Sequence, residues 1–447
     1  MMIIFYQKTF CETDHVNKCL TCMTDNCNCM YSWFTKSAGP TFFQYPDLSK
    51  NYLFNEPINT FVTEILLHDT ILLSGKPNYV YCHIPVLTDL NISKWRNYAA
   101  GYHDSKVLEF LEFGWPINFT NDTLPNPPQR KDSFAMNFEI DIDNYIAEEL
   151  ASGRIIGPFI NNPFRIQPAI APIFSVPKKE GGRRVIVDCS YGGNLSVNAG
   201  IQKDSFLGDE LTLQYPRHDK FIELLWKYGH GCHMFKIDLS KAFRQFPIDP
   251  RDYFLQCFTW KDSIYIDKRL IFGMRSSPQA CQRTTNLVNF ILSRQNIETI
   301  NYLDDFGGVA SPDRAEICYN KTLKIFVELG LKISEKKCSP PNHTMVFLGK
   351  EYNTNTMTVK IPDQKLIEII ETVKNFSNRK KCTKRQLQQL VGKLAFAAEC
   401  VRGGRLFISR MLATLRKYNF NHYRIYLDSE FHNDIKWWIS FLTLLMG

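Results

Sequence analysis

The sequence lacks any long apolar run: none of its 447 residues belongs to a stretch near the eighteen apolar residues that a membrane-spanning helix needs. A secretory signal is also lacking, because Met1 to Tyr6 is apolar but short and has no basic flank. We therefore expect an intracellular chain, cytoplasmic or nuclear and not secreted, with no membrane partner. Its 14 cysteines should stay reduced, most of them as small buried apolar side chains.

Two adjacent carboxylates form the most informative motif, Tyr302-Leu303-Asp304-Asp305, which lies between strand-like runs at Glu298–Ile300 and Phe306–Val309. Unpaired neighbouring acids repel each other by about 4 kcal/mol at an effective dielectric of about 20, and a divalent cation removes that repulsion. Asp-Asp followed closely by Gly-Gly is also common in solvated turns. The motif alone leaves a metal site and an ordinary turn both open.

A third carboxylate, Asp238, follows an apolar strand that begins near Met234. The interval before Asp304 can hold two strands, Tyr253–Trp260 and Ser263–Leu270, and a helix opening at Pro278. Strand, helix and strand hairpin in this order can place both acid sites side by side on one sheet. An isolated Asp at a strand end is often only a helix cap, but joined to the hairpin it favours a metal site.

Five motifs then follow one another as in the palm of reverse transcriptases: Asp238 with Phe243, Leu270–Gln282, Tyr302–Asp305, Gly330–Lys337, and the primer-grip residues Phe347, Leu348 and Gly349. Upstream, Val176–Asp188 resembles the fingers hairpin, and Ser196-Val197-Asn198 follows it as in many retroelement enzymes. The resemblance covers about residues 140 to 447. It implies an α+β, right-hand polymerase with fingers, a ferredoxin-like palm and a helical thumb.

Within reverse transcriptases the chain is most similar to enzymes of eukaryotic retroelements, a DIRS-type or gypsy-type relative. Three segments support this: Gln389–Ala398, Gly404–Phe407 and Trp437–Leu442. Helical packing also produces such Leu, Phe and Ala spacing, so a structural origin stays open.

The resemblance implies an RNA-directed DNA polymerase that adds deoxynucleotides to a primer 3′ end on RNA and DNA template-primers. Two-metal phosphoryl transfer is the implied mechanism, with two Mg²⁺ ions bound by hard oxygen ligands. Asp238 and Asp304 are implied to bridge the ions, with Asp305 and the backbone carbonyl of Leu239 as further ligands. Lys337 matches the position proposed to protonate the leaving pyrophosphate, although Lys336 is equally close in sequence.

Binding of the deoxynucleoside triphosphate is implied for seven residues: Lys178, Lys179, Arg184, Phe243, Gly273, Arg275 and Tyr302. Arg184 stands four residues before Asp188, as the family pattern requires, whereas the lysines are offset by one. Phe243 would sit beneath the sugar and clash with a 2′-hydroxyl, which selects deoxynucleotides. A core phenylalanine is the alternative, and each basic side chain could be only a solvated surface charge.

Positive charge is concentrated in residues 331–447, which carry 20 Lys and Arg against 9 Asp and Glu, whereas residues 1–330 carry 33 against 36. We expect a helix over Pro362–Phe376 with one apolar face, and a capping box at Thr383–Gln386 that opens the next helix. Such a thumb can turn its basic residues toward phosphates.

The N-terminal part is less informative. Cys11, His15, Cys19, Cys22, Cys27 and Cys29 form a Cys-x3-His-x3-Cys-x2-Cys pattern with two further cysteines. The pattern fits either a Zn²⁺-binding knuckle or a disordered remnant. The expected domains are residues 1–45 (Cys-rich segment), 46–139 (lead-in and linker), 140–353 (fingers and palm) and 354–447 (thumb and connection helices).

A retroelement copy that has decayed or been domesticated remains the alternative function, binding nucleic acid without polymerising. Only Thr443–Gly447 follow the Trp437–Leu442 stretch, so we expect no ribonuclease H activity. The sequence does not indicate the oligomeric state.

Overall fold

The computed structural model describes most of the chain, and the described residues form two compact units. The described ranges are 85–121, 123–128, 137–164, 166–178, 181–210, 215–401 and 403–445. The first unit contains the described residues up to Tyr215 together with 239–291 and 324–333, and the second contains 216–238, 292–323 and 334 onward. Helices α9 (Ser277–Arg294) and α10 (Ala315–Glu328) run from one unit into the other.

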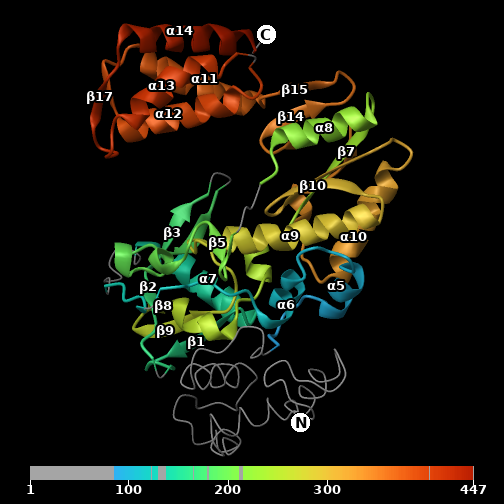
Figure 1. Ribbon diagram of the computed structural model, residues 1–447, viewed down its shortest axis with the longest axis vertical. Helices are drawn as coiled ribbons and strands as arrows, with labels where there is room; N and C mark the ends of the chain where they lie inside the picture. The colour runs from blue at the N-terminus through green and yellow to red at the C-terminus, as the bar shows by residue number, and fades with distance from the viewer. Residues whose placement is uncertain are drawn as a thin grey trace, which may run out of the picture. The chain divides into compact units, whose positions relative to one another are not determined.

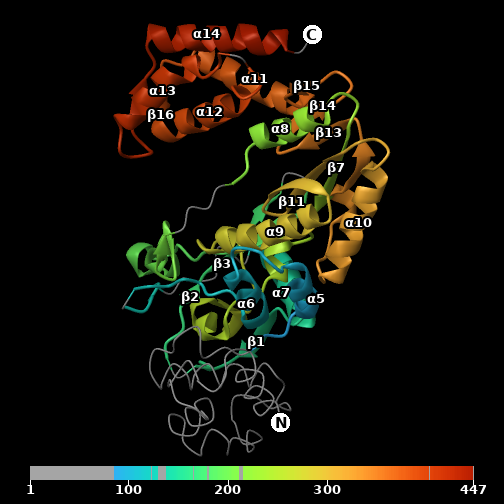
Figure 2. The ribbon, with the colours of Figure 1, turned by 45° about the vertical axis from the view of Figure 1, so that its right-hand side comes forward.

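The first unit includes two helices within the predicted lead-in and linker, α5 (Ile92–Tyr98) and α6 (Lys106–Phe113), which lie side by side (Figure 2). Trp95 is fully buried, and its indole Nε1 donates to the backbone oxygen of Leu329 at 2.9 Å. Trp115 is also fully buried, with its ring 4.8 Å from that of Phe110. Buried aromatic side chains therefore fix residues 85–121, part of the predicted lead-in and linker, in the core of this unit.

A four-stranded sheet and two hairpins form the rest of the first unit. The sheet has the order β1 (Ile155–Phe159), β9 (Ser263–Asp267), β8 (Cys257–Trp260), β2 (Ile170–Ala171). The hairpins are β3 (Ile173–Pro177) with β4 (Arg183–Val187) and β5 (Ser205–Phe206) with β6 (Asp209–Glu210). The first hairpin is the predicted fingers hairpin, and α7 (Glu139–Ala151) precedes it along the chain.

The two strands predicted between Tyr253 and Leu270 are both shorter than expected. Residues Pro250–Leu255 form a 3₁₀ helix, because Pro250 stands in its first turn and the Asp249 carboxylate accepts the Arg251 amide at 2.9 Å. The second strand ends at Asp267, whose carboxylate accepts the backbone N–H of Arg269 at 3.0 Å. Local side-chain capping thus overrides strand propensity at both ends.

A buried ion network holds the first unit together. The Arg244 guanidinium donates to Glu149 at 2.8 Å and to both carboxylate oxygens of Asp267 at 2.7 Å. Arg154 also donates to Glu149, at 2.7 Å. Burial pushes the pKa of Glu149 up, but the two guanidinium groups more than offset this, so that its pKa is lowered.

The second unit contains the predicted palm sheet, with the order β10 (Glu298–Tyr302), β11 (Asp305–Ala310), β7 (His233–Asp238), β12 (Ser339–Asn342). All neighbouring strands are antiparallel. Along the chain the elements run β7, α9, β10, β11, α10, β12. This is a βαββαβ succession with the strand order 4-1-3-2, so the ferredoxin-like prediction is confirmed.

A second sheet in this unit has the order β13 (Thr344–Phe347), β14 (Lys350–Asn353), β15 (Thr358–Lys360). It packs with α8 (His218–Tyr228) around Phe221, Phe347 and Tyr352, all three fully buried. The domain boundary predicted between residues 353 and 354 falls between β14 and β15, which pair through Asn353 and Thr358.

Four helices complete the second unit: α11 (Asp363–Ser377), α12 (Lys384–Ala397), α13 (Leu406–Arg416) and α14 (Ser429–Leu444), with the short strands β16 (Lys381–Thr383) and β17 (Arg424–Tyr426) (Figure 1). The apolar face predicted for the first helix is buried, and the capping box at Thr383 and Gln386 is formed. Among the described helices, none combines the length and apolar character needed to cross a membrane.

Candidate active site

The carboxylates meet at one end of the palm sheet. Strand β7 ends at Asp238 and β11 begins at Asp305, and these two residues are direct partners in the antiparallel ladder. Asp305 is also paired with Tyr302, so Leu303 and Asp304 form a two-residue loop between β10 and β11. The strand hairpin expected from the sequence is confirmed.

The hairpin is not an ordinary solvated turn. Leu303 has φ 53°, a left-handed conformation that a branched side chain rarely adopts and that costs on the order of 1–3 kcal/mol. Gly307 and Gly308 are buried strand residues and not turn residues. A Cβ atom on Gly308 would lie 2.1 Å from the Phe235 ring, and one on Gly307 would lie 2.8 Å from the Phe347 ring. Two aromatic rings therefore cover the glycines and fix this part of the strand.

Negative charge is crowded at the site. Burial, a hydrogen bond with Asp305 and the charge of Asp304 together raise the pKa of Asp238 to about 7. Burial and then the charge of Asp305 raise the pKa of Asp304. A cation held by these oxygens would remove the repulsion, and an all-oxygen set suits Mg²⁺. Among the described residues, however, no three His, Cys, Asp or Glu side chains form a group that could hold a metal ion as they stand.

Two lysines supply positive charge to the carboxylates. The Nζ of Lys337, the predicted general acid, lies 3.6 Å from Asp238 Oδ1, and the side chain is half exposed. The Nζ of Lys236 lies 2.9 Å from Asp305 Oδ1. Lys236 was not predicted, although the alternation of β7 places it on the same face as Asp238. A lysine among the apolar residues Met234, Phe235 and Ile237 was the signal that could have identified it.

In the first unit, Phe272 connects two of the predicted nucleotide-binding residues. The Arg184 guanidinium lies 4.6 Å from the centroid of the Phe272 ring, and the Phe243 ring lies 4.9 Å from the same ring. Phe243 is nearly buried at 8% exposure, whereas Phe272 is 37% exposed. The sequence motif contained Phe272, but its role as the surface between Arg184 and Phe243 was not predicted.

The loop that carries Gly273 is held by a buried asparagine. The side-chain amide of Asn198 donates to the Gly273 oxygen at 2.6 Å, and its oxygen accepts the Arg275 amide at 2.8 Å. Gly273 has φ +107°, and a Cβ there would lie 2.2 Å from the Val187 oxygen. The Arg275 guanidinium donates to the Ile201 oxygen at 2.7 Å, so part of its donor capacity is already used. Asn198 was not predicted as a site residue. Its role becomes visible only in the structure, where its buried side-chain amide contacts both Gly273 and Arg275.

The remaining predicted residues are divided between described and undescribed parts of the chain. Lys178 is exposed beside β3, Tyr302 is 38% exposed, and Leu239 forms an isolated bridge with Ile333. Lys179 and the candidate zinc ligands Cys11, His15, Cys19, Cys22, Cys27 and Cys29 lie outside the described residues.

The predicted primer grip is a hairpin with Leu348 and Gly349 as its two-residue loop, at φ 48° and 74°. Two positive φ values match the twist of the strands. Phe347 is fully buried against Phe221, at 4.8 Å between ring centroids. Phe347 is thus a packing residue, whereas the loop residues Leu348 and Gly349 are partly exposed, and the primer-grip role stays a prediction.

Residues 176–352 match the family described as reverse transcriptase (RNA-dependent DNA polymerase). The chain is 29% identical over 259 residues to a retrovirus-related Pol polyprotein from transposon 297 of Drosophila melanogaster, covering 55% of this chain and 22% of the relative. It is 23% identical over 308 residues to the Pro-Pol polyprotein of feline foamy virus, covering 69% and 24%. The chain thus spans about a quarter of the length of these relatives. These matches do not separate the DIRS-type from the gypsy-type prediction.

Solved structures support the fold. A foamy viral protease-reverse transcriptase in complex with double-stranded DNA aligns with a TM-score of 0.56 at 19% identity, covering 83% of this chain and 62% of that one. The same type of protein in complex with an RNA/DNA hybrid aligns with a TM-score of 0.54 at 19% identity, covering 80% and 47%. The right-hand α+β prediction is consistent with both alignments.

Proposed function

We propose that this chain, whose residues 176–352 form a domain of the reverse transcriptase family, is an RNA-directed DNA polymerase that extends a primer 3′ end with deoxynucleotides. One observation carries the proposal: Asp238 and Asp305 are paired across two strands, with Asp304 on the adjoining loop. Three acids at one strand end are unfavourable for folding and useful for binding cations that accompany phosphates.

Asp238, Asp304, Asp305 and the Leu239 carbonyl are the proposed metal ligands. When bound, two Mg²⁺ ions would stabilise the attacking and leaving oxygens of an in-line displacement at phosphorus. Lys337 is the proposed proton donor to pyrophosphate, since its ammonium already lies beside Asp238. Lys236 is proposed to orient the Asp305 carboxylate.

The proposed substrates are deoxynucleoside triphosphates and RNA or DNA template-primers. Arg184 is exposed and presents its guanidinium from the fingers hairpin for triphosphate oxygens, backed by Phe272. Phe243 is held against the same ring and is proposed to exclude a 2′-hydroxyl. The related foamy viral structures are complexes with double-stranded DNA and with an RNA/DNA hybrid, which supports this class of partner for the present chain.

Primer extension tests the proposal. The full chain is incubated with deoxynucleotides, Mg²⁺ and a labelled primer on an RNA or a DNA template, beside Asp304→Asn as the inactive control. Extension by the unmodified chain alone supports the polymerase. Template binding without extension would instead support the decayed or domesticated alternative, which the assembled carboxylates do not favour.

A further inference from the structure

Two segments of the second unit, 379–385 and 416–426, carry eight Lys and Arg residues and no Asp or Glu. Strands β16 and β17 join them, with Cys382 and Ile425 buried on the inner side. We call the exposed side of the two segments the basic aromatic surface.

The ladder fixes which side chains share this surface. Lys381 is paired with Tyr426 and Thr383 with Arg424, so these four side chains lie on the face opposite the buried pair. The Lys381 ammonium lies 4.3 Å from the centroid of the Tyr426 ring. A cation and an aromatic face are thus presented together.

Aromatic rings are unusually exposed on the same surface. Tyr426 is 72% exposed, Phe420 56% and Tyr423 40%. The rings of Phe420 and His422 are stacked, with centroids 5.8 Å apart, and Tyr423 meets Phe420 edge-on at 5.2 Å. A cluster of exposed rings leaves apolar area in water, which favours a ligand that covers it.

The cations of this surface are not neutralised. Within the part of the chain that the structure describes, none of the eight Lys and Arg side chains forms an ion pair with a carboxylate. Lys384 is engaged by the backbone oxygen of Tyr418. By contrast, Arg410 on the neighbouring helix α13 pairs with Asp434 at 2.6 Å. The surface is therefore complementary to a polyanion.

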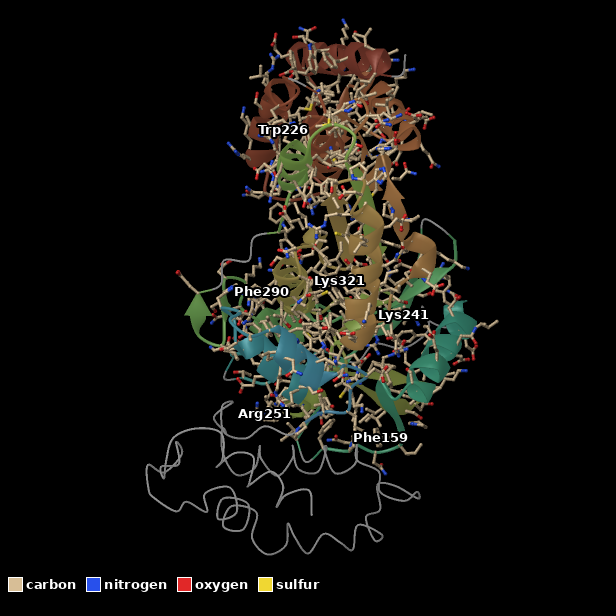
Figure 3. All side chains as sticks on the ribbon, turned by 90° about the vertical axis from the view of Figure 1, so that its right-hand side faces the viewer. Phe159, Trp226, Lys241, Arg251, Phe290 and Lys321 are labelled. Carbon is tan, nitrogen blue, oxygen red and sulfur yellow. The ribbon has the colours of Figure 1, made fainter. Side chains whose placement is uncertain are left out.

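Another exposed aromatic residue in the same unit has different surroundings. Trp226 on α8 is 72% exposed (Figure 3), but lysines of the same helix are paired: Lys220 with Glu223 at 2.8 Å, and Lys227 with Glu298. Trp226 is thus an exposed aromatic residue on a helix with paired lysines, and it serves as a control for the basic aromatic surface.

We propose that the basic aromatic surface binds single-stranded nucleic acid, with bases stacked on Phe420 and Tyr426 and phosphates beside Lys381 and Arg424. Aromatic faces accept any base and basic side chains follow the backbone, which gives binding with little sequence preference. A duplex hides its base faces within its own stack, so it can use only the cations. This site is separate from the carboxylates and goes beyond the proposed polymerase function.

The test measures binding of a fluorescein-labelled oligothymidine by anisotropy. It uses the 447-residue chain carrying Asp304→Asn, without nucleotides, so that the outcome does not depend on polymerisation. Phe420→Ala and Tyr426→Ala should each weaken binding by at least about fivefold, the lower end of what one stacked base contributes. Phe420→Trp should retain binding. Trp226→Ala, the matched control, should bind as the parent does.

Salt dependence tests the cations separately. Lys381→Ala should lower the slope of log K against log salt by about 0.7, the value for one phosphate of a single strand. Unchanged binding in both alanine variants would overturn the proposal. Equal weakening of a matched duplex and of the single strand would also overturn it, in favour of a grip on phosphates alone. Phe420→Leu, which keeps an apolar side chain but no ring, should weaken binding as much as Phe420→Ala does, while circular dichroism stays unchanged.

Discussion

Two charged clusters, one in each unit, are built in opposite ways. In the buried network of the first unit, Glu149 and Asp267 are both met by guanidinium groups at 2.7–2.8 Å. In the second unit, the described partners of the Asp238, Asp304 and Asp305 carboxylates are two lysines, one of them half exposed. In the first unit the carboxylates are paired with cations and stabilise the fold. In the second unit the excess of negative charge indicates a cation-binding site.

The largest expected effect is the loss of primer extension in Asp304→Asn. The substitution removes one negative oxygen ligand but almost no volume, so extension should fall by more than about a hundredfold, beyond what is usual for outer-shell changes at metal sites. The measurement is single-turnover extension with Mg²⁺. Template affinity and the melting temperature should be nearly unchanged, and extension above a tenth of the original rate would show that Asp304 is not a ligand.

Arg244→Met tests the other cluster. It leaves Glu149 and Asp267 buried without their shared cation, so the free energy of unfolding should fall by about 3–5 kcal/mol. Urea unfolding followed by circular dichroism measures it. A loss below about 1 kcal/mol would mean that the matched network contributes little. Lys220→Met, which breaks an exposed pair with Glu223, is the control. It should lower the free energy of unfolding far less than Arg244→Met does.

Phe243→Ala tests the residue that precedes Arg244 in the chain. The Phe243 side chain faces Phe272 and not the buried ion network. Removing the ring should let ribonucleotides be incorporated, with discrimination reduced by about tenfold or more if the ring excludes the 2′-hydroxyl. Competition between deoxy- and ribonucleotides in single-turnover extension measures this. Unchanged discrimination would make Phe243 a core residue.

The smallest effect should be the response of Asp238 to pH and Mg²⁺. Its pKa is raised from 3.8 to about 7 by burial, the hydrogen bond with Asp305 and the charge of Asp304. Between about pH 4 and pH 7 the folded chain therefore holds a proton that the unfolded chain has released, and stability from this group falls as the pH rises. Asp238→Asn should flatten the melting temperature across this window, and Mg²⁺ at pH 7 should stabilise only the unmodified chain, by a few degrees.

Asp252 is the matched control for that experiment. Burial and the charge of Asp249 raise its pKa to about 7 as well, but it lies in the first unit and accepts the Ile117 amide at 2.7 Å. Asp252→Asn should change the dependence of stability on pH and leave the Mg²⁺ response intact. Loss of the Mg²⁺ response in this variant would contradict the assignment of metal binding to the acidic strand end.

Local patterns predicted much of this molecule. The strands around Asp304 and the buried face of α11 follow from periodicity, and the capping box at Thr383 follows from two side chains three residues apart. These features depend on interactions within one element or between sequence neighbours, which a single sequence contains. The strand prediction at Tyr253 was wrong because Asp249 and Pro250 begin a 3₁₀ helix there.

Long-range contacts were the part that the sequence could not supply. Asn198 binds a loop 75 residues away, and Lys236 meets Asp305 across the strand ladder. Neither partner can be chosen from spacing, because many polar residues lie at comparable separations. The same holds for Trp95, whose burial depends on Leu329.

The glycine pair in β11 has a consequence for which insertions the chain can tolerate. Shifting a strand by one residue sends each side chain to the opposite face, so a single insertion in β7 would turn Asp238 away from Asp305 while the backbone ladder could still form. A one-residue shift of β11 itself would bring Phe306 to the position of Gly307 or Val309 to the position of Gly308, where the rings of Phe347 and Phe235 leave no room for a Cβ atom. Steric overlap therefore destabilises a sheet with the wrong strand register, independently of any effect on the carboxylates. Length changes should accumulate in the connections of this palm and be absent from its two central strands.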